Sequence, residues 1–340
     1  MQRSTFATFF SSVCLLSLGS AFAADEKPLD DAAKTPGTNP IFTDRFTADP
    51  APLVHDGRVY LYVGHDEAGP NEMFRITEWL AYSSDDMKNW TSHGPVMRPT
   101  DFSWAIRDAW ASEVEEKDGK FYLYTTVEHD ETDPGKAIGV AVSDSPTGPF
   151  VDARGSALVS NSMTKQASHS WDDIDPTVFQ DDDGTAWLYW GNQILYYAKL
   201  APNMIELDGP ITAVGIAPYE EGPWIHKHDG TYYLTYAAID RSVSDDEQIH
   251  YATAPSIEGP WIPQGMVTGS GKNSFTIHPG TVEYEGQWYL FYHDASLTVD
   301  GVEGALGRRA VRAEYLYHEP NGSLRAVEQT EAGLSVPPTP

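Results

Sequence analysis

The sequence contains very little cysteine and few basic residues. Its 340 residues include one cysteine, Cys14, which lies close to the N-terminus. Without a second thiol the chain cannot form an internal disulfide, and without Cys14 it has neither a thiolate nucleophile nor a cysteine ligand for a metal. Lys and Arg number 22 against 50 for Asp and Glu, which gives a formal net charge of −28. Such an acidic chain is a poor partner for nucleic acid or for an anionic membrane surface.

Long apolar runs are scarce as well. Residues 1–23 carry one charge, Arg3, then a short apolar stretch and the small-residue pattern Ala21-Phe22-Ala23, which is typical of a Sec-type signal peptide. No later stretch of about 18 uncharged apolar residues occurs, so no membrane span is expected. We therefore predict an exported protein, periplasmic or secreted, with residues 24–39 as a flexible leader and residues 40–340 as the folded domain.

Helical periodicity is nearly absent, whereas aromatic residues are abundant. Hydrophobic residues make up 41% of the chain and aromatic residues 12%, which supports a sizeable core, favours β-strands and offers ring faces for stacking against sugars. A turn followed by an aromatic strand recurs five times, about every 45 to 65 residues. The turns are Asp56-Gly57, Asp118-Gly119, Asp183-Gly184, Asp229-Gly230 and Glu285-Gly286. This repeat predicts an all-β fold, a five-bladed β-propeller of four-stranded units.

The strand before each turn is expected to be the innermost strand of its blade and to border the central channel. Four polar residues stand seven or eight positions before their turns: Asp49, Asp175, Glu221 and His278. In the second unit the equivalent place holds Trp110. Because matching places on innermost strands converge at one end of the axis, these five side chains are predicted to share one pocket.

Each candidate also has a purely structural interpretation. A single Asp in so acidic a chain is most often a surface residue, and His278 could equally be a hydrogen-bonded core residue. However, Asp49 and Asp175 each precede a proline at the head of an apolar strand, where solvation alone explains an acid poorly. The run 181–184 (DDDG) resembles the start of a calcium loop but lacks the later Glu ligand, so we interpret it as a hairpin turn.

From about residue 39 to residue 330 the chain resembles glycoside hydrolases of family 43, in the branch of arabinoxylan arabinofuranohydrolases and related arabinofuranosidases and xylosidases. The phrases that carry this resemblance are 48–52 (ADPAP), 60–66 (YLYVGHD), 110–112 (WAS), 171–177 (WDDIDPT), 221–224 (EGPW), 278–280 (HPG) and the pair Arg308-Arg309. Together they are specific for the family and less specific for the substrate.

The resemblance implies an inverting hydrolysis, in which a base activates water on one face of the sugar and an acid protonates the leaving oxygen on the other. It implies that Asp49 is the general base and Glu221 the general acid. Asp175 is then the third carboxylate, which orients Glu221 and raises its pKa. A negative charge close to Glu221 and partial burial would both act in that direction.

Further roles are implied for four other residues. Trp110 would form an apolar wall for the cleaved sugar, although a place in the blade core explains it nearly as well. One of Arg308 and Arg309 would hydrogen-bond that sugar; strand alternation directs only one of them inward, and we favour Arg309. His278 would point into the channel near a calcium ion held mostly by water. This ion would stabilise the structure or tune the site. No other cofactor and no protein partner is implied.

Two classes of function follow. The first is an exported hydrolase that releases terminal L-arabinofuranose from plant cell-wall polysaccharide such as arabinoxylan or arabinan. A β-xylosidase or a bifunctional xylosidase/arabinofuranosidase is the alternative within this class, and an endo-arabinanase is disfavoured by the resemblance. The second class is a catalytically silent glycan-binding propeller, which would have no need to keep three carboxylates. No appended carbohydrate-binding module or second sandwich domain is expected.

Overall fold

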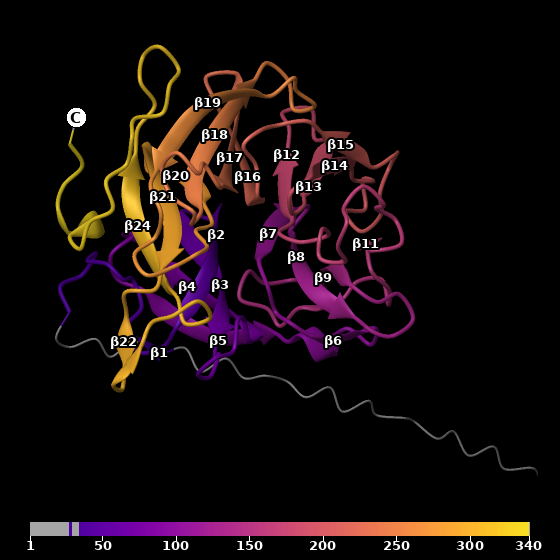
Figure 1. Ribbon diagram of the computed structural model, residues 1–340, viewed down its shortest axis with the longest axis horizontal. Helices are drawn as coiled ribbons and strands as arrows, with labels where there is room; N and C mark the ends of the chain where they lie inside the picture. Colours follow the sequence, from indigo (N-terminus) through magenta and orange to yellow (C-terminus); the bar gives the residue numbers. More distant parts are fainter. Residues whose placement is uncertain (1–26, 29–33, 340) are drawn as a thin grey trace, which may run out of the picture.

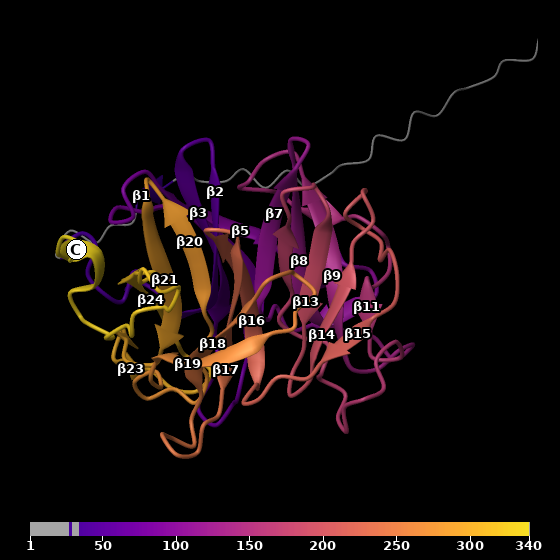
Figure 2. The same cartoon turned by 90° about the horizontal axis from the view of Figure 1, so that it is seen from above.

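The computed structural model describes residues 27–28 and 34–339 of the chain. Five antiparallel sheets stand radially around a central axis, as Figure 1 shows along the axis and Figure 2 from above. The prediction of an all-β, five-bladed propeller is confirmed. The predicted signal peptide, including Cys14, lies outside the described residues.

Each sheet forms one blade, numbered here in chain order. Blade 1 contains β2 (Thr47–His55), β3 (Arg58–Asp66), β4 (Ile76–Ser84) and β5 (Thr91–Met97), with the short β1 (Lys27–Pro28) on its outer edge. Blade 2 contains β6 (Ala105–Arg107), β7 (Ser112–Lys117), β8 (Lys120–His129), β9 (Lys136–Ser143), β10 (Val151–Asp152) and β11 (Val159–Ser160). Blade 3 contains β12 (Thr177–Gln180), β13 (Ala186–Trp190), β14 (Leu195–Lys199) and β15 (Thr212–Val214).

Blade 4 contains β16 (Glu221–His228), β17 (Thr231–Ala238), β18 (Gln248–Ala254) and β19 (Ile262–Thr268). Blade 5 contains β20 (Gly280–Tyr284), β21 (Gln287–Asp294) and β24 (Ala310–Leu316), with the hairpin β22 (Thr298–Val299) and β23 (Val302–Glu303) between the last two. Two 3₁₀ turns, η1 (Pro99–Asp101) and η2 (Gly333–Ser335), complete the described elements. Among these elements, no helix has the length and apolar character needed to cross a membrane.

The hairpin turns have the geometry that their sequences demand. Asp56 and Gly57 both have positive φ, 48° and 72°, as a type I′ turn requires. The turns of blades 2, 4 and 5 share this pair of positive φ values. In blade 3 the run 181–184 instead closes through a hydrogen bond from the Gly184 N–H to the Asp181 carbonyl, so it is a hairpin turn of another type. Every turn returns the chain beside its innermost strand.

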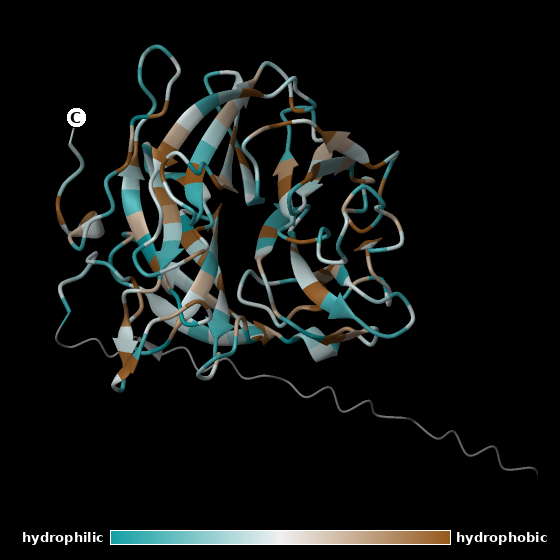
Figure 3. Ribbon diagram, in the orientation of Figure 1, coloured by the Kyte–Doolittle hydropathy of each residue, from teal (hydrophilic) through white to brown (hydrophobic). Residues whose placement is uncertain are grey.

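The innermost strands β2, β7, β12, β16 and β20 contact one another in a closed ring around the axis. Along the strands, hydrophobic residues alternate with polar ones, as the brown and teal segments of Figure 3 show. Buried aromatic and aliphatic side chains fill the spaces between neighbouring blades; one cluster joins Tyr62 of blade 1 to Phe121 and Leu123 of blade 2. The blades therefore hold one another in place through shared cores.

Blade 5 has three strands in its sheet rather than the four that the repeat predicts. The chain preceding β2 runs along its open edge: the Ile41 N–H donates to the Val311 carbonyl (2.7 Å), and the Thr47 N–H donates to the Arg309 carbonyl (2.9 Å). The N-terminal segment thus closes the ring. Asn39, predicted as the last residue of a flexible leader, is buried and accepts a hydrogen bond from the Ala313 N–H (2.9 Å), so it belongs to the folded domain.

Candidate active site

The three predicted carboxylates stand at the heads of innermost strands, in unusual backbone conformations. Asp49 lies in β2 at a β-bulge with a φ of 54°, and Asp175 lies just before β12 with a φ of 59°. Glu221 begins β16 beside Gly222, whose φ is 58°, at a second bulge. Bulges and left-handed residues redirect side chains out of the regular alternation of a strand. Outside the hairpin turns such conformations are costly for residues other than glycine, so the strained backbones of Asp49 and Asp175 suggest that their side-chain positions matter.

One cavity of about 580 Å³ gathers the predicted residues. Its lining includes one residue from the head of each innermost strand, together with an arginine of blade 5: Asp49, Trp110, Asp175, Glu221, His278 and Arg309. A volume of this order is typical of sites for small ligands. Arg308 does not line the cavity; its side chain donates to the carbonyls of Glu303 (2.8 Å) and Ala68 (3.0 Å), which is a structural role.

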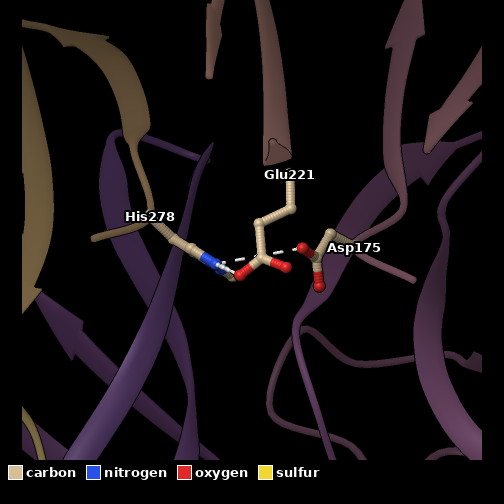
Figure 4. A group of neighbouring side chains, drawn as sticks. All are labelled: Asp175, Glu221 and His278. Atoms are coloured by element: carbon tan, nitrogen blue, oxygen red, sulfur yellow. Dashed lines mark hydrogen bonds and ion pairs between the residues drawn. The ribbon is translucent and has the colours of Figure 1, made fainter. Parts of the chain in front are cut away.

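His278 lies between the predicted base and the predicted acid. Its Nδ1 is 3.1 Å from Asp49 Oδ1, and its Nε2 is 2.9 Å from Glu221 Oε1 and 3.9 Å from Asp175 Oδ2. Figure 4 shows the imidazole directed toward Glu221, with Asp175 reaching in from the opposite side. One imidazole ring and a polar contact on each side therefore separate the Asp49 and Glu221 carboxylates.

Asp49 is held ionised by its neighbours. Burial favours the neutral form, but the Arg309 guanidinium and His278 outweigh it and hold the pKa of Asp49 well below its usual range. Arg309 Nη1 lies 3.1 Å from Asp49 Oδ1, while its Nε and Nη2 donate to the Asp66 carboxylate at 2.9 and 3.1 Å. The Asp49 N–H also donates to His293 Nδ1 (3.2 Å), which fixes the backbone at the bulge.

The pKa values of Asp175 and Glu221 differ from the sequence-based expectation. Burial raises the pKa of Asp175 to about 8; His278 opposes this shift, and the charges of Glu221 and Asp49 add to it. Burial acts in the same direction on Glu221, but hydrogen bonds from His278 and from Asn192 Nδ2 (2.7 Å to Oε2) outweigh it and lower the pKa of Glu221. The expected rise in the pKa of Glu221 is therefore not found, because no motif indicated that His278 contacts Glu221.

His278, rather than Glu221, has a raised pKa next to the acid and can hold the proton that was expected on Glu221. Burial alone would lower the pKa of His278, but the carboxylates of Asp175 and Asp49 outweigh it and raise this pKa well above its usual value. The imidazolium then donates from both ring nitrogens toward carboxylates. A proton on Nε2 is one hydrogen bond away from Glu221.

Trp110 lies on the cavity wall with one face on a buried cation. Lys136 Nζ stands 3.6 Å from the centroid of the Trp110 ring, and it also pairs with Asp108 and with Glu128 Oε2 (3.0 Å). Phe74 packs edge-on against Trp110, with ring centroids 5.9 Å apart. Trp110 is therefore both a cavity wall and part of a fixed cluster, so the two interpretations of this residue are compatible.

Polar residues at the ends of the second strands also belong to the site, although no motif predicted them. Asp66 ends β3, Glu128 lies near the end of β8, and Asn192 follows β13. Because the two strands of a hairpin are antiparallel, the end of the second lies beside the head of the first, as Thr47 pairs with His65. Polar residues at that place in each repeat could have identified Asp66 and Asn192. Glu247, which precedes β18, has no equivalent signal.

Asp175, Glu221 and His278 also form a group of potential metal ligands within the described residues, with one ligand atom from each lying within 4.8 Å of the others. Carboxylate oxygens suit a hard cation such as calcium, which takes about six to eight oxygen ligands. The imidazole nitrogen is a poorer ligand for it, and both nitrogens of His278 already contact carboxylates. The group can thus supply two oxygens, and water would have to supply most of the others.

Comparison with known proteins identifies the family. The model of glycosyl hydrolases family 43 matches residues 37–241, which is more than half of the chain. The chain is a member of glycosyl hydrolase family 43. A xylosidase/arabinosidase of Bacteroides ovatus is 32% identical over 332 residues, covering 83% of this chain and 95% of the relative. The predicted family resemblance is confirmed, and the protein is a glycoside hydrolase of an inverting family.

Two further relatives of this family 43 hydrolase are named for different activities. An arabinoxylan arabinofuranohydrolase of Paenibacillus polymyxa is 30% identical, covering 98% of this chain but 58% of the relative. The solved structure of CoXyl43, a β-xylosidase/α-arabinofuranosidase from a compost microbial metagenome in complex with xylotriose, superimposes with a TM-score of 0.75 at 28% identity. It covers 88% of this chain and 98% of CoXyl43.

Proposed function

We propose that this family 43 hydrolase releases terminal L-arabinofuranose from arabinoxylan or arabinan with inversion. The observation that carries the proposal is the position of Asp49 and Glu221 on opposite sides of the His278 ring, in the wall of one cavity. Such a separation leaves room for a water molecule beside the sugar, as inversion requires. The similarity to an arabinoxylan arabinofuranohydrolase supports the proposed substrate class.

In the proposed mechanism, Asp49 accepts a proton from a water molecule while the water oxygen bonds to the anomeric carbon. Glu221 gives its proton to the glycosidic oxygen as the bond to the anomeric carbon breaks. Its lowered pKa requires that this proton come from a neighbour, and the hydrogen bond to His278 Nε2 provides a direct route. Asn192 and Asp175 hold Glu221 and the adjoining backbone, since Gly222 N–H donates to Asp175 Oδ2 (3.0 Å).

A β-xylosidase activity is the second candidate. It is supported by the xylosidase names of two relatives and by the xylotriose bound to CoXyl43. The purified protein should be incubated with nitrophenyl α-L-arabinofuranoside, nitrophenyl β-D-xyloside, arabinoxylan and debranched arabinan. We expect arabinose as the main product, identified by chromatography, and inverted configuration of the first-formed sugar by proton NMR. Xylose as the main product would favour the second candidate, and no release from any substrate would favour a silent binding propeller.

We extend the proposal to a calcium ion at Asp175, Glu221 and His278. These residues would hold it directly or through water, and its positive charge would offset the negative charge that the carboxylates bring to the channel. Calcium should then raise the melting temperature of EDTA-treated protein, whereas magnesium at equal concentration should not. We also propose export through the predicted signal peptide; fractionation of the producing cells, with mass spectrometry of the mature N-terminus, tests it.

A further inference from the structure

Glu247 is the most deeply buried carboxylate in the cavity wall, and the mechanism above leaves it without a role. It is 1% exposed and precedes β18. Its Oε2 accepts a hydrogen bond from the Ile277 N–H (3.0 Å), whereas its Oε1 has no partner among the described residues. A buried polar atom left unpaired costs about 1–3 kcal/mol, so a native protein keeps one mainly where something else completes it.

Two other buried polar atoms without a partner belong to the lining of the same cavity. They are Trp110 Nε1, which can only donate, and Asn192 Oδ1, which can only accept. The amide orientation of Asn192 is fixed, because its Nδ2 donates to Glu221. Three unsatisfied polar atoms around one cavity call for a ligand with several groups that both donate and accept, and sugar hydroxyls have this property.

We propose that Glu247 is a specificity residue whose Oε1 hydrogen-bonds one hydroxyl group of the sugar held between Asp49 and Glu221. The inference rests on the proposed function and goes beyond it, because it assigns recognition to a residue outside the three carboxylates. Glu247 lines the cavity together with Glu221 and His278, the two residues between which the leaving-group proton passes. A hydroxyl bound there would fix the ring relative to the proton donor.

The chemistry of Glu247 agrees with this role. Burial, together with the charge of Glu221, raises the pKa of Glu247 well above its usual value. With Oε2 occupied by the Ile277 N–H, the proton belongs on Oε1, which can then donate to the sugar. A glutamine reproduces this pattern, because its amide oxygen can accept from Ile277 and its NH₂ can donate. A methionine of similar size can do neither.

The test compares Glu247→Gln with Glu247→Met on nitrophenyl α-L-arabinofuranoside and on its 2-, 3- and 5-deoxy analogues. For the wild type we expect kcat/KM to fall at least about tenfold more for one deoxy position than for the others. Glu247→Gln should keep most of this selectivity. Glu247→Met should lose it, because kcat/KM should fall for every glycoside that carries the recognised hydroxyl and stay unchanged for the one deoxy analogue that lacks it. Gln248→Met is the matched control, since Gln248 is fully buried beside Glu247 but does not line the cavity.

Other outcomes are equally decisive. If Glu247→Met lowers kcat/KM by one factor for the parent and for every deoxy analogue, Glu247 only positions the 275–278 segment or binds a buried water, and the proposal fails. Should the wild type hydrolyse none of these glycosides, the proposed function fails first. In that case the affinities of L-arabinose, D-xylose and their deoxy analogues are measured by calorimetry for the wild type and for Glu247→Met. The proposal then requires that one deoxy position weaken binding in the wild type and that Glu247→Met remove this difference.

Discussion

Arg309 Nη1 lies 3.1 Å from Asp49 Oδ1, and the same guanidinium donates from Nε and Nη2 to the Asp66 carboxylate. Arg309 is buried, so this positive charge acts with little screening from solvent. Asp66 holds the guanidinium in place, and the guanidinium in turn keeps Asp49 ionised. Arg309 and Asp66 thus support the proposed role of Asp49 as the general base.

Replacing Arg309 should move the acidic limb of the pH profile. Without the guanidinium, burial dominates and the pKa of Asp49 rises, so Asp49 loses its negative charge at a higher pH than in the wild type. We expect the acidic limb of kcat/KM for Arg309→Met to shift upward by about one pH unit or more, and Arg309→Lys to shift less. An acidic limb that stays in place in both variants would show that Asp49 is not the base that this limb reports.

Asp49→Asn and Glu221→Gln should each remove most turnover while leaving the fold intact, because both changes preserve shape. We expect kcat to fall about 10²- to 10⁴-fold in each variant. Glu221→Gln should regain activity on nitrophenyl glycosides relative to arabinoxylan, since a good leaving group needs less protonation. Equal losses on both substrates would argue against Glu221 as the acid. The adjacent Glu220→Gln, also in the cavity lining, is the control and should retain most activity.

Lys136 should affect both substrate binding and stability. Its ammonium contacts the Trp110 ring and pairs with two carboxylates, Asp108 and Glu128. Lys136→Met removes this support and leaves the exposed Arg107, at 3.4 and 3.8 Å, as the remaining cation beside both acids. We expect KM to rise several-fold with a smaller change in kcat, and the free energy of unfolding to fall by about 1–3 kcal/mol. Steady-state kinetics and denaturant titration measure the two effects.

Lys120→Met provides the comparison for Lys136. Lys120 pairs with Asp144 on the surface, where both side chains are exposed and solvent screens the pair, so its removal should leave the free energy of unfolding and KM nearly unchanged. If Lys136→Met unfolds at the same denaturant concentration as the wild type, the buried cluster does not stabilise this wall. An unchanged KM would show that Trp110 does not contact the sugar.

The repeat in the sequence predicts the blades because local chemistry sets each hairpin. Asp-Gly turns such as Asp56-Gly57 and the aromatic strands behind them need no distant partner to be recognised. The heads of the innermost strands follow from the same register, which is why Asp49, Asp175 and Glu221 could be expected in one pocket. These predictions depend on position alone.

Contacts between blades are what the sequence does not reveal. His278 bridges Asp49 and Glu221 only because three blades meet at the axis, and this contact reverses the expected pKa shift of Glu221. Within blade 2, Lys136 of β9 reaches Trp110 at the head of β7, and Glu247 enters the cavity wall from a loop that carries no motif; the repeat predicts neither position. The pKa shifts depend on these distances, so they can be predicted only once the positions of the side chains in the folded propeller are known.

Glu115 should make the stability of the propeller depend on pH. It lies on β7, the innermost strand of blade 2, and its Oε2 accepts from Gln180 Nε2 (2.7 Å) of blade 3. Burial raises the pKa of Glu115 from 4.5 to about 7; the Gln180 hydrogen bond opposes this shift, and Glu116 adds to it. Between these two pH values the folded protein keeps a proton that the unfolded chain releases. The contribution of Glu115 to the free energy of unfolding is therefore largest below pH 4.5 and falls as pH rises through 7.

Glu115→Gln removes this titration, since glutamine is neutral at every pH and its amide oxygen can still accept from Gln180. We expect the variant to match the wild type near pH 4.5 and to exceed its free energy of unfolding by up to about 3 kcal/mol at pH 8.5. Denaturant titrations at the two pH values measure this difference, and Glu283→Gln, at an exposed position on β20, should show none. A gain for Glu115→Gln that is equal at both pH values would mean that Glu115 does not titrate in this range. The added stability would then come from packing between blades 2 and 3 rather than from a buried charge.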